Sequence, residues 1–324
     1  MSEKMKNILV VGGAGYIGGL TTDILLEKGY NVTVYDNLMY ETRFLKPCSF
    51  IYGDIRDTEK LLSLEREYDE IIWLAAIVGD EACEQDEELT REINVNSLRR
   101  FLEKTKRKVV FASTCSVYGA TKDIVNEEGP TNPLSLYAVT KLEAEKYVME
   151  NGGSVFRLGT VYGLGDVHSR IRLDLVVNIL TLKAVRDGKL TIFGGDQYRP
   201  IIAVRDVANY LTEAVTRDYN DIFVVKYRNI RILELAELIK TILPSAEMEV
   251  TDREFEDLRS YRVDSSKVEK YFTFKPETSI EAEIIKMKNI FEEHRIRNVN
   301  DAIYHNANYV KALLDNSMFS KGSK

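Results

Sequence analysis

Three glycines spaced three residues apart, Gly12, Gly15 and Gly18, lie between two apolar stretches of different pattern. The stretch 7–11 is continuously apolar and predicts a buried strand, whereas 15–29 has the periodicity of a helix. Glycine at such a junction permits a tight turn and lets the backbone come close to a pyrophosphate. The free N–H groups at the start of the helix then face the phosphates. This arrangement predicts the first unit of a dinucleotide-binding sheet.

The first half of the chain continues to alternate between strand-like and helix-like stretches. Further strands are predicted at 31–36, 49–54, 70–76, 108–113 and 154–159, and helices at 58–68, 84–105 and 135–151. Continuously apolar strands that alternate with helices are typical of a parallel sheet covered on both faces. The predicted fold class is therefore α/β, with a Rossmann-type doubly wound parallel sheet.

The pattern changes after about residue 160. Helices are predicted at 174–188 and 231–243, a short strand at 190–195, and a mostly helical tail from about residue 279. We therefore expect two domains: the dinucleotide-binding sheet over 1–165, and a smaller mixed α/β substrate-binding domain with the tail over 166–324. Residues 190–230 are expected to return partly to the first domain.

Composition and charge exclude several classes of protein. The net charge of −7 argues against a general nucleic-acid or membrane-surface binder. The three cysteines, at positions 48, 83 and 115, have no paired spacing, which argues against disulfides and a metal site and favours the cytoplasm. The longest apolar run, 71–78, is too short to span a bilayer, and the N-terminus shows no secretory signal.

Asp36 closes the second predicted strand about twenty residues after the glycines. A carboxylate at this place accepts hydrogen bonds from an adenosine ribose and repels a 2′-phosphate, which favours NAD over NADP. The alternative is an ordinary aspartate in a solvated loop.

Tyr137 and Lys141 are four residues apart in the helix predicted at 135–151, so they share one face. A free tyrosine has a pKa of about 10, but a nearby ammonium and an oxidised nicotinamide both favour the phenolate. Such a tyrosine can take a proton from a sugar hydroxyl while hydride leaves the same carbon. The alternative is a surface pair without a catalytic role.

Taken together, these motifs resemble the extended short-chain dehydrogenases/reductases, specifically the NAD-dependent nucleotide-sugar epimerase/dehydratase group. The resemblance covers roughly residues 7–275. It rests on the glycine-rich turn, Asp36, GD (53–54), LAA (74–76), NVN (94–96), STCSVYG (113–119) and YAVTK (137–141), which occur in the family's order and spacing.

The resemblance implies a role for each matching residue. Tyr137 would be the general base or acid, Lys141 would tune it and bind the nicotinamide ribose, and Thr114 would bond the hydroxyl that is oxidised. The implied NAD-binding residues are Gly12, Gly15, Tyr16, Ile17, Gly18, Asp36, Asn37, Asp54, Ile55, Leu74, Ala75, Ala76, Asn94, Ser113, Tyr137 and Lys141. The implied substrate-binding residues are Val78, Asp80, Thr114, Cys115, Ser116, Thr160, Arg170, Arg172, Asp174, Leu175, Asn178 and Arg199.

Several of these substrate positions depart from the family or leave alternatives open. Thr160 stands where the family often has asparagine, which puts the phosphate contacts there in doubt. Arg170 and Arg172 could grip a phosphorylated substrate or lie in a solvated loop, and Asp80 could face the sugar or be solvated. Arg199 matches the arginine that meets the substrate's phosphates, a task that suits a planar, bidentate guanidinium.

The residues after Thr114 bear on the reaction. The family's 4,6-dehydratases have Asp and Glu there, as base and acid for the loss of water, whereas this chain has Cys115 and Ser116. We therefore expect NAD-dependent oxidation at carbon 4 of a nucleoside-diphosphate sugar without dehydration, by a 4-dehydrogenase or a 4-epimerase. A 4-ketoreductase and a non-catalytic NAD-binding regulator are the alternatives.

The family implies three further expectations. The enzyme would be a homodimer or homotetramer, with no nucleic-acid or membrane partner. The family includes capsule-sugar enzymes that act on GDP-linked heptoses. The arginine-rich stretch 168–174 favours a substrate other than that of a standard UDP-galactose epimerase.

Overall fold

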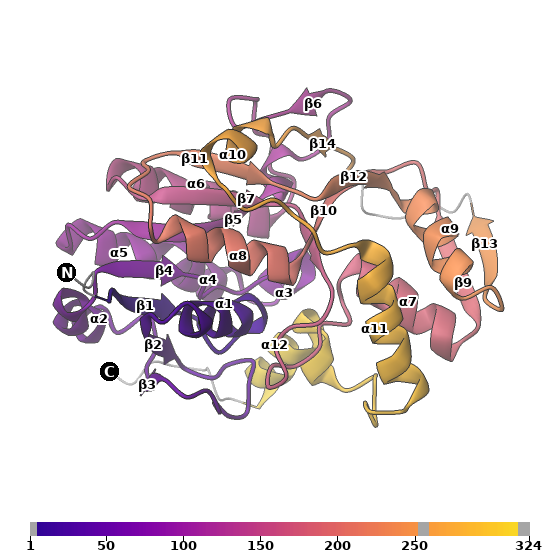
Figure 1. Cartoon of the computed structure of the whole chain (residues 1–324), viewed down its shortest axis with the longest axis horizontal. Coiled ribbons are helices and arrows are strands. Elements are labelled where there is room, and N and C mark those ends of the chain that lie inside the picture. Colours follow the sequence, from indigo (N-terminus) through magenta and orange to yellow (C-terminus); the bar gives the residue numbers. More distant parts are fainter. Residues whose placement is uncertain (1–4, 252–258, 317–324) are drawn as a thin grey trace.

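The computed structural model describes residues 5–251 and 259–316. Its centre is a seven-stranded sheet in which every neighbouring pair of strands is parallel (Figure 1). In spatial order the strands are β11 (Ile222–Val225), β7 (Ser154–Leu158), β5 (Val109–Thr114), β4 (Glu70–Trp73), β1 (Asn7–Val11), β2 (Asn31–Asp36) and β3 (Ser49–Tyr52). The predicted fold class is confirmed.

Alternate residues of each strand serve opposite faces of the sheet. In β1, Leu9 and Val11 belong to one apolar core, and Ile8 and Val10 to the other. The first core packs under α2 (Thr58–Leu64), α5 (Ser97–Lys104) and α6 (Leu136–Glu150). The second packs under α1 (Tyr16–Glu27), α8 (Val204–Ala214) and α10 (Ser266–Tyr271).

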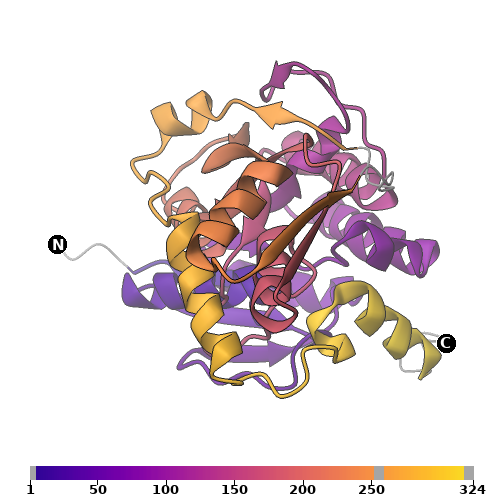
Figure 2. The same cartoon turned by 90° about the vertical axis from the view of Figure 1, so that its right-hand side faces the viewer.

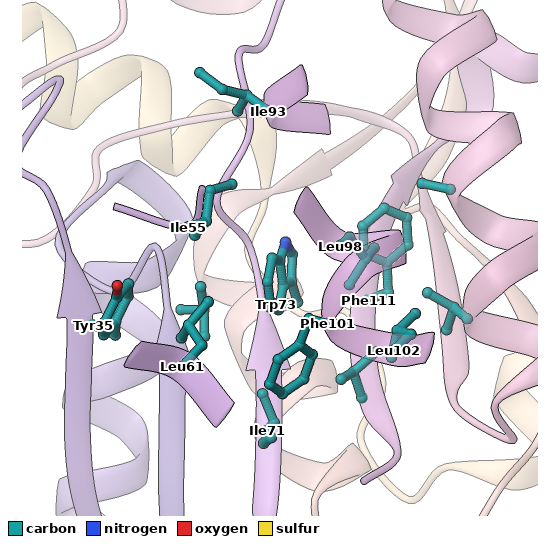
Figure 3. Packing of buried hydrophobic residues seen from close by; sticks show 14 of the residues in the cluster. Tyr35, Ile55, Leu61, Ile71, Trp73, Ile93, Leu98, Phe101, Leu102 and Phe111 are labelled. Atoms are coloured by element: carbon teal, nitrogen blue, oxygen red, sulfur yellow. The ribbon is translucent and has the colours of Figure 1, made fainter. Parts of the chain in front are cut away.

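The first core is centred on aromatic side chains. Figure 3 shows Trp73 of β4 beside Phe101 of α5, and their ring centres are 5.4 Å apart. Both side chains are at most 1% exposed. This packing fixes the strand β4, whose carboxyl end leads into the candidate site.

The predicted helix over 84–105 is interrupted. α3 (Asp80–Glu84) ends where this helix was expected to begin, and the remaining stretch consists of α4 (Glu87–Arg91), a π-helical segment (Glu92–Asn96) and α5. The side chain of Asp86 caps α4 by accepting a hydrogen bond from the Leu89 N–H, so the chain starts a new helix there. The π-helical stretch turns Asn94 into the interior, where it is 3% exposed.

A second lobe has an apolar core of its own and lies beyond the carboxyl ends of the strands, on the right in Figure 1. It contains α7 (Val176–Arg186), α9 (Ile232–Ile242), α11 (Ile280–Glu292) and the parallel pair β9 (Lys189–Phe193) and β13 (Glu247–Thr251). Two small sheets accompany it: β8 (Thr160–Tyr162), β10 (Tyr198–Ala203) and β12 (Arg228–Arg231), and the pair β6 (Ile124–Val125) and β14 (Arg262–Val263).

Parts of the second half of the sequence lie against the large sheet. β11 pairs with β7, and α8 packs beside α1, while β9 stays in the second lobe. The exact division into two domains stays a prediction.

The helical tail predicted from residue 279 consists of α11, a 3₁₀ turn (Ala302–Tyr304) and α12 (Asn306–Asp315); residues 317–324 lie outside the described part. Figure 2 shows α12 well separated from α11, and α12 packs on α3 of the first half. Among the described residues, no helix is long and apolar enough to cross a bilayer.

Candidate active site

A cavity of about 1290 Å³ lies at the carboxyl ends of the central strands. The chain passes from β1 to β2 and β3 on one side and returns to β4 on the other, so the strand order reverses between β1 and β4. Ligands of doubly wound sheets bind outside the carboxyl ends at such a reversal.

The glycine-rich turn forms one wall of the cavity. Gly12 has φ +82°, and a Cβ atom on it would lie 2.5 Å from the Ala75 nitrogen, so both conformation and space require glycine. A Cβ atom on Gly18 would lie 2.3 Å from the Gly12 carbonyl oxygen. The helix α1 begins after Gly15 with no side-chain cap, which leaves its first N–H groups available to a phosphate.

Asp36, at the end of β2, lines the cavity beside this turn. Its carboxylate accepts hydrogen bonds from the N–H of Ala14 (3.1 Å) and of Leu38 (2.7 Å). Burial raises its pKa above the usual range, while these N–H groups oppose that rise. A solvated loop aspartate is thereby excluded.

Asp54 lies at the far end of the same wall. It accepts two hydrogen bonds from the Arg56 side chain (2.9 and 2.8 Å) and one from the Asn37 amide (3.2 Å). The open helix start, Asp36 and this wall together fit the phosphates and ribose of an adenine dinucleotide.

Thr114, Tyr137 and Lys141 line the cavity together. Thr114 is the last residue of β5, and its Oγ1 accepts a hydrogen bond from the Ser116 N–H (3.0 Å). Ser135 caps α6 by accepting from the Ala138 N–H, which fixes the helix turn that carries Tyr137.

Burial dominates the electrostatics of the pair on α6. It raises the pKa of Tyr137 well above 10, with smaller increases from Cys83 and Asp80, whereas Arg172 and the hydrogen bond with Thr114 lower it. Burial also lowers the pKa of Lys141 to about 8. Lys141 was expected to lower the pKa of Tyr137, but Arg172 is the main positive group that does so here.

Arg199 of β10 and Arg259 lie at the second-lobe end of the cavity. The Arg199 guanidinium donates hydrogen bonds to the carbonyl oxygens of Tyr198 (3.0 Å) and Arg259. Arg259 forms an ion pair with Asp80 (2.5 Å), which also accepts a hydrogen bond from Ser135 (2.5 Å). The Asp80 carboxylate is therefore held by two partners, although its side chain is 26% exposed. Arg259 comes 60 residues after Arg199, so no local pattern in the sequence points to it.

Arg170 and Arg172 are buried, at 9% and 8% exposed, so the solvated-loop alternative is wrong. Arg172 donates two hydrogen bonds to the Asp174 carboxylate (2.8 and 3.0 Å). Arg170 donates to the Ile303 carbonyl oxygen (2.5 Å) and to the Asn306 side chain, both in the C-terminal part of the chain.

Three predicted site residues lie away from the cavity. Asn94 bonds both backbone groups of Ile77 (2.8 and 2.9 Å), and the Cys115 thiol donates to the Arg157 carbonyl oxygen (3.2 Å). Asn178 bonds both backbone groups of Gly163 (3.0 and 3.1 Å). All three are at most 3% exposed, and their hydrogen bonds hold the surrounding loops. Their predicted ligand contacts stay predictions.

The other predicted site residues all line the cavity: Gly12, Gly15, Tyr16, Ile17, Gly18, Asp36, Asn37, Asp54, Ile55, Leu74, Ala75, Ala76, Val78, Asp80, Ser113, Thr114, Ser116, Tyr137, Lys141, Thr160, Arg170, Arg172, Asp174, Leu175 and Arg199. The cavity is also lined from the C-terminal part by His305–Asn308, which no pattern in the sequence had indicated.

The profile of the NAD dependent epimerase/dehydratase family matches residues 8–225. The chain belongs to this family. A UDP-glucose 4-epimerase of Halalkalibacterium halodurans is 32% identical over 228 residues, which span 62% of this chain and 68% of that protein. A putative UDP-glucose 4-epimerase of Methanocaldococcus jannaschii is 29% identical over 300 residues, 87% of this chain and 97% of that one.

The fold is likewise similar to a UDP-glucose 4-epimerase of Thermotoga maritima solved with UDP-glucose. The TM-score is 0.78 at 26% identity, and the match covers 89% of this chain and 99% of the other. The protein is thus an NAD-dependent enzyme of the extended short-chain dehydrogenase/reductase type that acts on nucleotide sugars as an epimerase or dehydratase. The Gly-rich turn, Asp36, Tyr137 and Lys141 fit that cofactor.

Proposed function

We propose that this enzyme is a 4-epimerase of a UDP-linked sugar. The observation that carries the proposal is the common cavity, which joins the glycine-rich turn to Thr114, Tyr137 and Lys141 and continues to Arg199. The UDP-glucose 4-epimerases that match this chain at 29–32% identity support the choice of sugar nucleotide.

Tyr137 is the general base in this proposal. Burial keeps its phenol protonated in the cofactor-free protein, and the positive charge of a bound oxidised nicotinamide favours the phenolate that the reaction needs. Thr114 accepts or donates a hydrogen bond at the carbon-4 hydroxyl and orients it, while Tyr137 takes the hydroxyl proton. When bound, NAD supplies the hydride acceptor for carbon 4 and, once reduced, the hydride donor. The 4-keto sugar then rotates in the pocket, so that the opposite face of carbon 4 receives the hydride and the configuration at carbon 4 is inverted. Tyr137 returns the proton to the carbonyl oxygen in the same step.

Two cationic side chains bind the diphosphate in this proposal. Arg199 is 9% exposed and Arg259 is held by Asp80 at 2.5 Å, so both guanidinium groups are oriented before substrate arrives. Guanidinium groups bond phosphate oxygens in pairs, and an oriented group loses less entropy on binding.

The two positions that carry the base and the acid in the family's 4,6-dehydratases hold neither group here. Cys115 is 0% exposed, and burial raises the pKa of its thiol far above the usual range, so it does not ionise at neutral pH. Ser116 faces the cavity but is a very poor base. Carbon 6 therefore keeps its hydroxyl group.

The test is incubation of the purified enzyme with UDP-glucose, UDP-galactose and their N-acetylated forms, followed by proton NMR of the anomeric signal. We expect one of these sugars to reach a mixture of its two C4 epimers without accumulation of NADH. Stoichiometric NADH would identify a 4-dehydrogenase instead, and a product lighter by one water would identify a dehydratase.

The same assay with GDP-linked sugars, including heptoses, tests the alternative substrate class. A homodimer or homotetramer remains our proposal for the assembly, to be measured by light scattering. The cytoplasmic location also remains a proposal.

A further inference from the structure

Residues 302–315, here named the C-terminal strap, cross the cofactor end of the cavity. The strap contains the 3₁₀ turn and α12, and its residues His305–Asn308 line the cavity. Its residue Val310 is 1% exposed and belongs to the core beside α3. Asn306 and Val310 are the two buried residues of α12, so these two side chains anchor the strap.

Asn306 holds the strap to two other segments. It is 2% exposed, and its side-chain amide donates to the carbonyl oxygen of Val78 (2.7 Å), which follows β4. Its backbone N–H donates to the Asp174 carboxylate (3.1 Å), and its side-chain oxygen accepts from Arg170.

The strap reaches the loop after β2 directly through Tyr309 and indirectly through Arg170, which bonds Asn306. The ring of Tyr309 lies 5.9 Å from that of Tyr40, and the Arg170 guanidinium lies 4.6 Å from the same Tyr40 ring. The backbone N–H of Arg170 also donates a hydrogen bond to the Glu41 carboxylate (3.1 Å). Tyr40 and Glu41 come four and five residues after Asp36.

The two loops that the strap contacts follow strands on either side of β1. β1 lies between β4 and β2, so a segment fastened to the loops after β4 and β2 passes over the end of β1. The glycine-rich turn follows β1. The strap therefore spans the wall that fits the dinucleotide's phosphates.

We propose that the C-terminal strap retains NAD in its site and must open for the cofactor to enter or leave, with Asn306 as its main fastening. This inference rests on the proposed function, because an epimerase regenerates its cofactor in every turnover and needs no exchange. A 4-dehydrogenase would have to open the strap in each cycle.

The test is the kinetics of cofactor exchange on the full-length protein. NADH-loaded enzyme is mixed with excess NAD to obtain the dissociation rate from the loss of bound-NADH fluorescence, and stopped-flow mixing with NADH gives the association rate. A gate limits both directions, so Asn306→Ala should accelerate both rates by at least about tenfold, the factor for roughly one buried hydrogen bond. The equilibrium Kd should change much less.

Two further variants make the result interpretable. Tyr309→Ala removes the contact with Tyr40 and keeps the Asn306 hydrogen bonds, so it should act in the same direction even if Asn306→Ala folds poorly. Lys311→Ala, on the exposed side of α12, is the matched control and should leave both rates unchanged. If these variants release NADH faster but bind it at an unchanged rate, they have lost a contact with the cofactor. That result would overturn the proposal that the strap is a gate.

Cofactor exchange is measured without any sugar nucleotide. Its result therefore tests the strap independently of the proposed 4-epimerase activity. Slow exchange in the native protein without interconversion of C4 epimers would leave the strap standing and overturn the proposed function. Native protein that exchanges NADH as fast as Asn306→Ala would overturn the strap, whatever the enzyme does to UDP-sugars.

Discussion

The side-chain nitrogen of Lys141 lies 4.2 Å from the centre of the Phe111 ring. The lysine is 4% exposed, and burial lowers its pKa to about 8, from about 10.4 in an unfolded chain. Between these two pH values the unfolded chain binds more protons than the folded one. The contribution of Lys141 to the free energy of unfolding therefore rises with pH over this window and is constant below it.

We expect Lys141→Met to stabilise the cofactor-free protein at pH 7, by on the order of 3 kcal/mol, because the buried charge is gone. The advantage should shrink as the pH rises from 8 to 10.5. Urea unfolding at several pH values gives the free energy of unfolding of both proteins. The difference between the two values reports Lys141 alone, because the other titrating groups contribute equally to both. Lys311→Met is the exposed control, and an equal pH dependence in native protein and Lys141→Met would contradict the assignment.

Tyr137→Phe should retain NAD and lose most of its turnover. The change removes the proton acceptor and leaves the ring in place, and general acid–base groups contribute about 10²–10⁴-fold. Epimerisation rates by NMR and NAD binding by calorimetry are the two measurements. Unchanged turnover would remove Tyr137 from the mechanism.

Asp36→Asn should narrow the preference for NAD over NADP. The amide keeps an acceptor for the N–H groups of Ala14 and Leu38 but loses the charge that repels a 2′-phosphate. Calorimetric titration with both cofactors gives the ratio of affinities. If the native protein already binds NADP as tightly as NAD, Asp36 does not determine which of the two cofactors is bound.

Arg199→Ala should weaken binding of the sugar nucleotide by about ten- to hundred-fold, the loss of one charge-assisted hydrogen bond. NAD affinity should not change, because Arg199 lies on β10 at the other end of the cavity. Arg205→Ala, at an exposed position of α8, is the control. A fall in NAD affinity instead would show that the two ends of the cavity have been assigned in reverse.

Local patterns predicted the parts of the site that depend on local geometry. The glycines of the turn need only the strand before them and the helix after them, and Tyr137 and Lys141 need only the helical repeat. Asp86 shows the limit of such patterns, because its capping contact with Leu89 divides a stretch whose periodicity predicts one helix.

The parts of the fold and of the site that were not predicted depend on contacts between segments far apart in the sequence. The sequence leaves open whether Arg170 grips a phosphorylated substrate or lies in a solvated loop, because its partner Asn306 comes 136 residues later. Arg259 and β11 were missed for the same reason: each is defined by a neighbour far away in the chain. The local pattern of apolar and polar residues carries no information about such long-range contacts.

The position of β11 has a consequence for synthesis of the protein. β11 covers the outer edge of β7, and Phe223 on it packs against Phe156 with ring centres 5.5 Å apart. A nascent chain that has emerged only to about residue 165 therefore presents β7 as a bare edge, and bare edges recruit other chains. The ribosome must deliver a further 60 residues, to Val225, before this edge is sealed. The edge of β7 therefore stays open to pairing with other chains until that interval has been made.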